Sequence, residues 1–199
     1  MRSLTVQMPN FIALLVLASS LTACVSSIKP ETKQSDFYDF GLQKPEQQVD
    51  FGLPLESLSA VEAVQHGNIR YRLAYNNPTQ VFTYAGSRWS SLPVELLRQQ
   101  IGNNPKPEAR CSLKLQLVAF DQVFDSASSS HGVVQLQASI VERRTRTIVG
   151  QTLLSAQAPA SSADAKGGVA ALNQASASVL QHAADWVKAT AASQSCQTQ

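Results

Sequence analysis

Two stretches in the second half of the chain alternate strictly between apolar and polar residues, and this pattern constrains the fold more than any other feature. In the first stretch, Leu113, Leu115 and Leu117 alternate with polar side chains. In the second, every other residue from Val134 to Ile140 is apolar. Alternation with a period of two predicts strands that bury one face, as in antiparallel sheets covered on one side. We therefore expect two antiparallel neighbours with a layer packed on their apolar face.

Weaker patterns predict the remaining strands. The loop at residues 125–130 joins the two alternating strands, and a turn at 142–146 leads into a third strand at about 147–156. Four further segments have strand character: residues 36–41, 59–65, 68–75 and 81–84. Gly67 permits a tight turn, so 59–65 and 68–75 are expected to form a hairpin. Residues 43–54 read as a polar connection.

Two helices are expected. The first begins near Pro93, because proline is tolerated in the first helical turn, and it ends at Gly102. The second covers about 168–189, with a narrow apolar side that ends at Trp186. Strands followed by helices on one face predict an α+β fold. The expected architecture is a mostly antiparallel sheet of about five to seven strands with two helices packed on one face.

The N-terminus carries the pattern of a secretion signal. Arg2 supplies a positive charge, and residues 11–18 form an apolar run that is too short to span a bilayer. A cleaved signal at residues 1–23 fits this pattern better than an anchor helix. Removing the first 23 of 199 residues leaves 176, which is about one domain.

Leu21-Thr22-Ala23-Cys24 is similar to the bacterial lipobox. In that class the cysteine carries a diacylglycerol and an N-linked acyl chain, and together these anchor a protein stably. A soluble secreted protein with a chance cysteine is the alternative. Val25, rather than aspartate, follows the cysteine, which favours lipid anchoring at the periplasmic face of the outer membrane. Residues 24–35 then form a lipidated tether, 36–190 the domain and 191–199 a C-terminal tail.

Charge and cysteine content narrow the function classes. All 14 acidic and 15 of the 16 basic residues follow the signal, and no long basic run exists, so nucleic acid is not an expected partner. Arg143, Arg144 and Arg146 read as a solvated turn rather than a phosphate site. Cys111 and Cys196 remain after lipidation, and an oxidising compartment favours a bridge between them. A buried thiol and a loose one are the alternative.

Motifs that would carry catalysis or bind metal do not occur. The chain contains no phosphate-binding glycine loop ending in lysine, and no serine lies in a nucleophile-elbow pattern. The three histidines, His66, His131 and His182, are too far apart for a ligand motif. We therefore expect no catalytic residues, no metal, no cofactor beyond the covalent acyl groups on Cys24, and no enzyme activity.

Three ordered segments resemble the ABC-type transport auxiliary lipoproteins, the PqiC-like family that accompanies MCE-type lipid transporters. They are DFYDFG at 36–41, then IRYRLAY at 69–75 with YAGSRWSSLP at 84–93, and finally the closing helix with ALNQA at 171–175 and DWV at 185–187. The resemblance covers about residues 36–190.

This resemblance implies a non-catalytic outer-membrane subunit that docks or supports a periplasmic lipid-transport assembly. Its partners would be an MCE-domain protein and an ABC permease and ATPase, with a homo-oligomer as a further option. A periplasmic lipid-binding module and an envelope enzyme are the alternatives. Trp89 is expected first of all in the core, and Arg88 is expected to pair with a carboxylate or a backbone carbonyl. Contact of both residues with the partner protein is the second interpretation.

Overall fold

The computed structural model describes residues 34–42, 48–103, 108–193 and 196. The predicted signal at 1–23, the lipidation site Cys24 and nearly all of the predicted tether at 24–35 lie outside the described residues. No helix within the described part of the chain is both long and apolar enough to cross a membrane.

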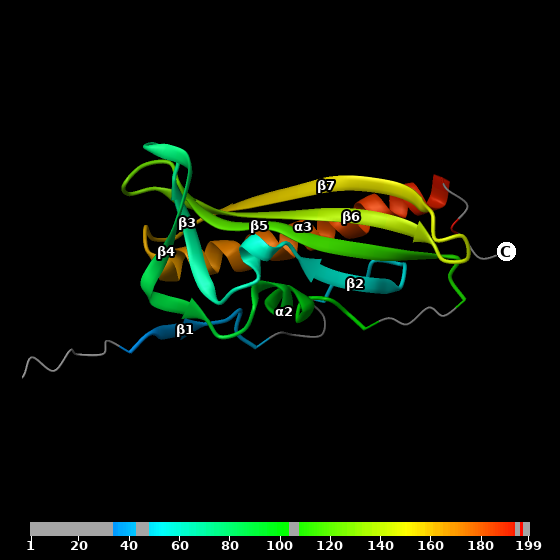
Figure 1. Ribbon diagram of the computed structural model, residues 1–199, viewed down its shortest axis with the longest axis horizontal. Helices are drawn as coiled ribbons and strands as arrows, with labels where there is room; N and C mark the ends of the chain where they lie inside the picture. Colours follow the sequence, from blue (N-terminus) through cyan, green and yellow to red (C-terminus); the bar gives the residue numbers. More distant parts are fainter. Residues whose placement is uncertain (1–33, 43–47, 104–107, 194–195, 197–199) are drawn as a thin grey trace, which may run out of the picture. The chain divides into compact units, whose positions relative to one another are not determined.

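Three long antiparallel strands form the main part of the sheet (Figure 1). They are β5 (Cys111–Phe124), β6 (Ser130–Glu142) and β7 (Ile148–Pro159). The β5 and β6 strands pair from Cys111↔Glu142 to Phe124↔Ser130. Leu113, Leu115 and Leu117 are fully buried. The structure therefore confirms both the antiparallel pairing and the buried face that the alternating pattern predicted.

A bulge in β5 reverses which residues face inward. The register shifts between Leu117 and Ala119, so the buried positions change from odd numbers to even ones. Phe120 is then buried, and Gln122 is completely enclosed. An extra residue in one strand produces this change of face, which explains why the alternation in the sequence stops at Leu117.

Four further strands complete a seven-stranded mixed sheet. They are β1 (Asp36–Tyr38), β2 (Leu55–Ala60), β3 (Asn68–Leu73) and β4 (Asn77–Trp89). The order is β1-β4-β3-β5-β6-β7, and β2 also pairs with β5. The pairs β1–β4, β2–β5 and β3–β5 are parallel, whereas β3–β4 is antiparallel.

The predicted hairpin between residues 59–65 and 68–75 is wrong. The strand β2 ends at Ala60, and a short 3-10 helix, η2 (Glu62–Val64), follows it. Both β2 and β3 run parallel to β5, one pairing with its first half and the other with its last residues. They pair with successive parts of the same side of β5, and buried Val64 lies between them in the chain.

Two other expectations need correction. The strand predicted at 81–84 extends to 77–89 and includes Pro78, which is exposed near the hairpin turn, where a missing N–H is tolerated. The polar connection at 43–54 contributes to the core, since Phe51 and Leu53 are buried. Val49 also forms a bridge to Ile101.

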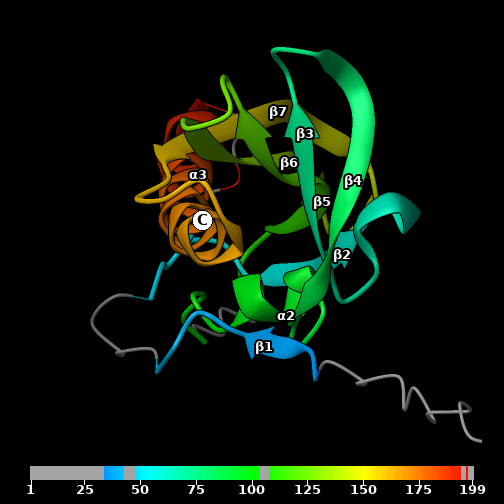
Figure 2. The ribbon, with the colours of Figure 1, turned by 90° about the vertical axis from the view of Figure 1, so that its left-hand side faces the viewer.

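The long helix α3 (Ala165–Ser193) packs on one face of β5, β6 and β7 (Figure 2). Its start is capped by Asp164, whose carboxylate accepts a hydrogen bond of 2.8 Å from the Gly167 N–H. That bond lowers the pKa of Asp164, as expected for an anion at a helix N-terminus. Small residues allow close approach, because a Cβ on Gly132 would lie 2.7 Å from the Ala171 carbonyl carbon.

The second helix, α2 (Pro93–Arg98), is short. Leu96 and Leu97 are completely buried in the same core as the apolar side of α3. The α+β fold class with two helices, predicted from sequence, is therefore confirmed, and the sheet is a mixed one.

Candidate functional site

The strand β1 lies beside the C-terminal part of β4, where the first candidate residues are found. Tyr38 pairs with Trp89 in the parallel register, and the Ser90 N–H donates a hydrogen bond of 2.8 Å to the Tyr38 carbonyl. We call residues 36–42 and 89–92 the anchor end, because the chain enters the domain here from the predicted tether.

Trp89 is a core residue. Its side chain is 3% exposed, and its ring lies 5.9 Å from Phe40 and 5.4 Å from Phe120, measured between centroids. This burial excludes a direct partner contact through the Trp89 ring in this conformation. Arg88 is exposed and donates a hydrogen bond to the Asn68 side-chain oxygen, so the expected carboxylate or carbonyl partner is wrong. Contact of Arg88 with a partner protein stays a prediction.

A groove of about 490 Å³ lies beside the anchor end. Its wall combines residues from α3, the end of α2 and the segment after β1, none of which titrates: Phe40, Leu42, Gln100, Ala170, Asn173, Gln174 and Ala177. A groove of this composition can hold an apolar or amide-bearing group, and it offers no acid, base or nucleophile for catalysis.

Gln100 is the most unusual residue of this groove. It is 5% exposed, and its Nε2 donates a hydrogen bond of 2.6 Å to Asn173 Oδ1. Asn173 in turn donates to the Phe40 carbonyl at 3.4 Å. The Gln100 Oε1 has no hydrogen-bond partner among the described residues. Buried acceptors normally find a donor, so this enclosed oxygen is an unsatisfied acceptor in the wall of the groove.

The tyrosine–arginine strand is fixed by a buried ion cluster. Arg70 and Arg72 lie on one face of β3, and the Nε of each is 2.7 Å from a different oxygen of Asp121 on β5. Arg70 also donates to the Ala63 carbonyl in η2. Burial of charge is tolerated when the groups pair this closely, so these arginines join η2 and β3 to β5. The sequence pattern did not identify Asp121.

The opposite face of β3 carries an aromatic cluster next to the start of α3. Tyr71 stacks on Phe82 with a centroid distance of 5.3 Å. The Tyr84 hydroxyl donates a hydrogen bond of 2.9 Å to Gln122 Oε1, and burial raises the pKa of Tyr84 above its ordinary value. A phenol in this environment stays protonated, so this cluster stabilises the junction between sheet and helix.

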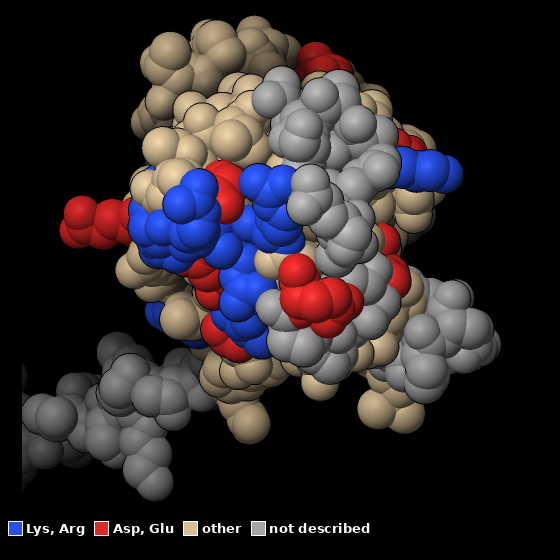
Figure 3. Space-filling view, turned by 90° about the vertical axis from the view of Figure 1, so that its right-hand side faces the viewer, with Lys and Arg blue, Asp and Glu red and all other residues tan. Residues whose placement is uncertain are grey.

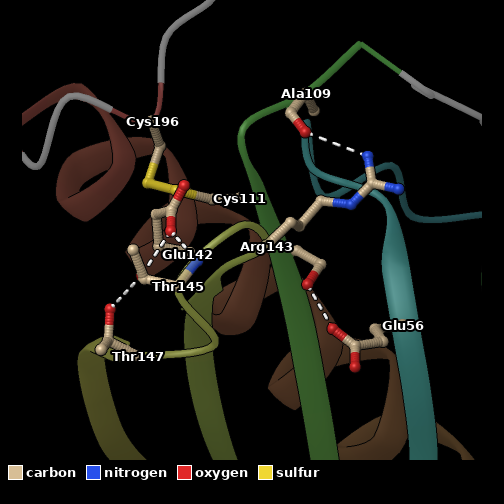
Figure 4. The surroundings of a disulfide bond; sticks show 9 residues. Glu56, Ala109, Cys111, Glu142, Arg143, Thr145, Thr147 and Cys196 are labelled. Carbon is tan, nitrogen blue, oxygen red and sulfur yellow. Dashed lines mark hydrogen bonds between the residues drawn. A yellow bond between two sulfur atoms is a disulfide. The ribbon is translucent and has the colours of Figure 1, made fainter.

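At the other end of β5, Cys111 and Cys196 form a disulfide (Figure 4). Their Cα atoms are 5.3 Å apart, and both residues are buried. The bridge joins the start of β5 to the segment after α3, and the bonded pair replaces the alternative of two free thiols. We call this region, with residues 54–56 and 142–148, the disulfide end.

Charged side chains gather on the surface at this end of the domain (Figure 3). Glu56 accepts a hydrogen bond from the Ser112 hydroxyl and pairs with Arg146 at 2.9 Å and Lys114 at 3.2 Å. These interactions, the Ser112 bond foremost, lower the pKa of Glu56 from 4.5 to about 2. Arg143 donates to the Ala109 carbonyl at 3.0 Å. The arginine cluster is thus a turn whose charges are partly paired.

Among the described residues, no three His, Cys, Asp or Glu side chains lie close enough together to hold a metal ion. His66 accepts a hydrogen bond from the Asn68 N–H at 3.3 Å, His131 lies 2.9 Å from Asp125, and His182 is exposed on α3. The structure therefore places the three histidines apart.

No family model and no curated protein matches the chain. Solved structures do match its fold. A Xanthomonas campestris protein of the DUF330 family superposes with a TM-score of 0.64 and 19% sequence identity, over 81% of this chain and 99% of that chain. A protein described as uncharacterized superposes with a TM-score of 0.57 and 12% identity, over 78% of this chain and 98% of that chain. At these identities the likeness shows a shared fold.

Proposed function

We propose that this chain is a non-catalytic lipoprotein subunit of an MCE-type ABC transport system. It would be held at the periplasmic face of the outer membrane by acyl chains on Cys24, and it would dock or support the lipid-transport assembly. The structural observation that supports the anchoring part of this proposal is the placement of β1. Asp36 follows Cys24 by only 12 residues and begins a strand paired within the sheet.

A short tether limits where the domain can act. Twelve residues extend at most about 40 Å, so the folded part would stay close to the lipid surface. A domain held in this way is suited to positioning a partner. The described groove, lined by residues without titratable groups, agrees better with binding than with catalysis.

The transport role itself rests on the sequence resemblance. Two of its arginines are bound to Asp121, and its tryptophan is buried in the core. These residues account for the fold that the resemblance implies. The exposed residues near them, above all Arg88, are the ones available to a partner such as an MCE-domain protein.

The first test is the fate of the cysteine. The Cys24→Ala variant should accumulate as unprocessed precursor and take up no labelled fatty acid, whereas the parent should be labelled. Fatty-acid labelling of the variant equal to that of the parent would contradict lipidation at Cys24. Sucrose-gradient separation should place the parent in the outer membrane, and recovery from the inner membrane would contradict the proposed location.

The second test concerns partners. Crosslinking of intact envelopes followed by isolation of the native lipoprotein should recover an MCE-domain protein, and an Arg88→Ala variant should recover less of it. A Glu95→Ala variant is the control, because Glu95 is exposed on α2 and pairs with its neighbour Arg98. Recovery of no transport component from the parent would contradict the proposal.

A lipid-binding module is the second candidate, and the groove at Gln100 is the observation that favours it. A bound lipid amide or hydroxyl could donate to the unpartnered Gln100 Oε1. Mass spectrometry of gently purified protein would detect lipid beyond the covalent anchor. Loss of that lipid in a Gln100→Leu variant would support this function over docking alone.

A further inference from the structure

Exposed apolar side chains are concentrated at the anchor end. Within the described ranges, large hydrophobic residues with high exposure occur in three places: Phe37, Leu42 and Leu92 at the anchor end, Tyr75 and Val81 at the β3–β4 turn, and Ile148 and Leu153 on β7. The first group is the largest, and it contains the two most exposed of these side chains, Leu42 and Phe37. Scattered single residues of this kind are normal on surfaces, but a local group marks an interaction site.

The three side chains of the first group belong to segments that meet. Phe37 is 64% exposed, and its neighbour Tyr38 accepts the backbone hydrogen bond from Ser90. Leu92, 42% exposed, follows Ser90 by two residues. Leu42 is fully exposed at the other end of the segment that starts with β1. Figures 1 and 2 both place β1 at the edge of the domain opposite β7.

We propose that Phe37, Leu42 and Leu92 form a membrane-binding face that inserts into the interface of the lipid layer holding the acyl chains of Cys24. This inference rests on the proposed lipid anchor and specifies how the domain lies on the membrane. The predicted lipid anchor, which precedes the described residues, identifies the lipid layer as the partner of this face. Thirteen residues separate Cys24 from Phe37, so an extended tether keeps Phe37 within about 45 Å of the lipid.

The charges around this face determine the kind of binding. Asp36 and Asp39 are exposed beside Phe37, and Arg88 is the cation in register with it. A face with no excess of basic residues gains nothing from anionic headgroups. Its binding depends on burial of aromatic and aliphatic side chains at the interface, as in other interfacial anchors. It should therefore change little with salt or with the content of anionic lipid.

Such a face supplies a second contact beside the acyl chains. It holds β1 against the lipid and directs the β7 edge of the sheet away from it. The groove at Gln100, which shares Leu42 with this face, then opens close to the lipid surface.

The test uses the full lipidated chain in vesicles of phosphatidylethanolamine and phosphatidylglycerol, with and without brominated acyl chains. Phe37→Trp introduces an indole into the proposed face, and Leu153→Trp introduces a matched one at a 54% exposed position on β7. The signal of the native tryptophans is subtracted with the parent protein. We expect strong quenching by brominated lipid for Phe37→Trp, little for Leu153→Trp, and no change for either in high salt.

Flotation of the same vesicles distinguishes a failure of the lipid anchor from a failure of the membrane-binding face. Protein that floats but shows equal or no quenching at the two positions overturns the membrane-binding face and leaves the anchor intact. Lipidated chain that does not float overturns the anchor and the face together. Quenching at residue 37 that is lost in high salt overturns the apolar mode of binding.

Discussion

The two ends of the domain are stabilised by different chemistry. At the anchor end, Trp89, Phe40 and Phe120 pack ring against ring in the core. At the disulfide end, a covalent bond between Cys111 and Cys196 joins the start of β5 to the segment after α3, and ion pairs of Glu56 with Lys114 and Arg146 lie at the surface. Aromatic packing stabilises strands that already bury a face, whereas a terminal segment with little apolar surface needs a crosslink.

This difference bears on function. The end held by its core leaves Phe37 and Leu92 free to remain exposed, because the fold does not depend on them. Disulfides form and persist in oxidising compartments, which agrees with the secretion signal predicted at the N-terminus. The contrast between the two ends can be tested by substitution at each of them.

Truncation of the aromatic cluster should have the largest effect. Trp89→Ala removes a buried ring and leaves a cavity, which should lower the free energy of unfolding by about 3–5 kcal/mol. Urea denaturation of the full chain measures it. Trp186→Ala is the control at the other end of α3, where the ring is only partly buried, and it should cost less. Unchanged stability of the Trp89→Ala variant would contradict the role of this ring in the core.

Loss of the disulfide should have the next largest effect. The bridge closes a separation of 85 residues, and removing such a crosslink from a secreted domain costs about 2–4 kcal/mol. The Cys196→Ser variant should show this loss in the same urea experiment. A reducing agent should weaken the parent by a similar amount and leave the variant unchanged. Equal stability of variant and parent under oxidising conditions would refute a stabilising role for the bridge.

Two glycines under α3 compare its ends directly. A Cβ at Gly132 would meet the helix backbone at Ala171, whereas a Cβ at Gly150 would meet the Thr190 methyl group at 2.9 Å. Backbone cannot move aside as a side chain can, so Gly132→Ala should cost about 1–3 kcal/mol. Gly150→Ala should cost less. The reverse order in thermal unfolding would show that α3 is held more tightly at its C-terminal half.

The smallest effect is expected at the surface ion pairs of the disulfide end. The folded-state pKa of Glu56 is about 2, below the ordinary 4.5, so its contribution is present above pH 4.5 and is lost as the pH falls through about 2. The side chain is 26% exposed, and Glu56→Gln should cost less than about 1 kcal/mol at neutral pH. The free energy of unfolding of the Glu56→Gln variant should also decline less steeply in acid than that of the parent.

A second variant checks the cause. Ser112→Ala removes the hydroxyl that contributes most to the lowered pKa of Glu56, so titration by carboxyl NMR should find that pKa moved back toward 4.5. A Glu56 pKa that remains at about 2 would assign the shift to Arg146 and Lys114 instead.

The local sequence determined the elements whose signals repeat at short range. The alternation in β5 and β6 predicted their buried face, and the spacing of apolar residues with Trp186 predicted α3. Proline at position 93 marked the start of α2. The lipidation site at Cys24 was inferred from four adjacent residues, and its lipidation stays a prediction. These patterns are readable because each reflects only the geometry of its own strand, helix or motif.

The tertiary structure alone decided which segments meet. Parallel pairing of β2 and β3 with β5 joins residues about 50 positions apart, and no local pattern marks such partners. The same holds for Asp121 between two arginines and for Gln100 against Asn173, because single polar residues carry no period. Their roles depend on burial, and burial is a property of the assembled core. The sequence could name the two cysteines, but only the packing of α3 brought them within bonding distance.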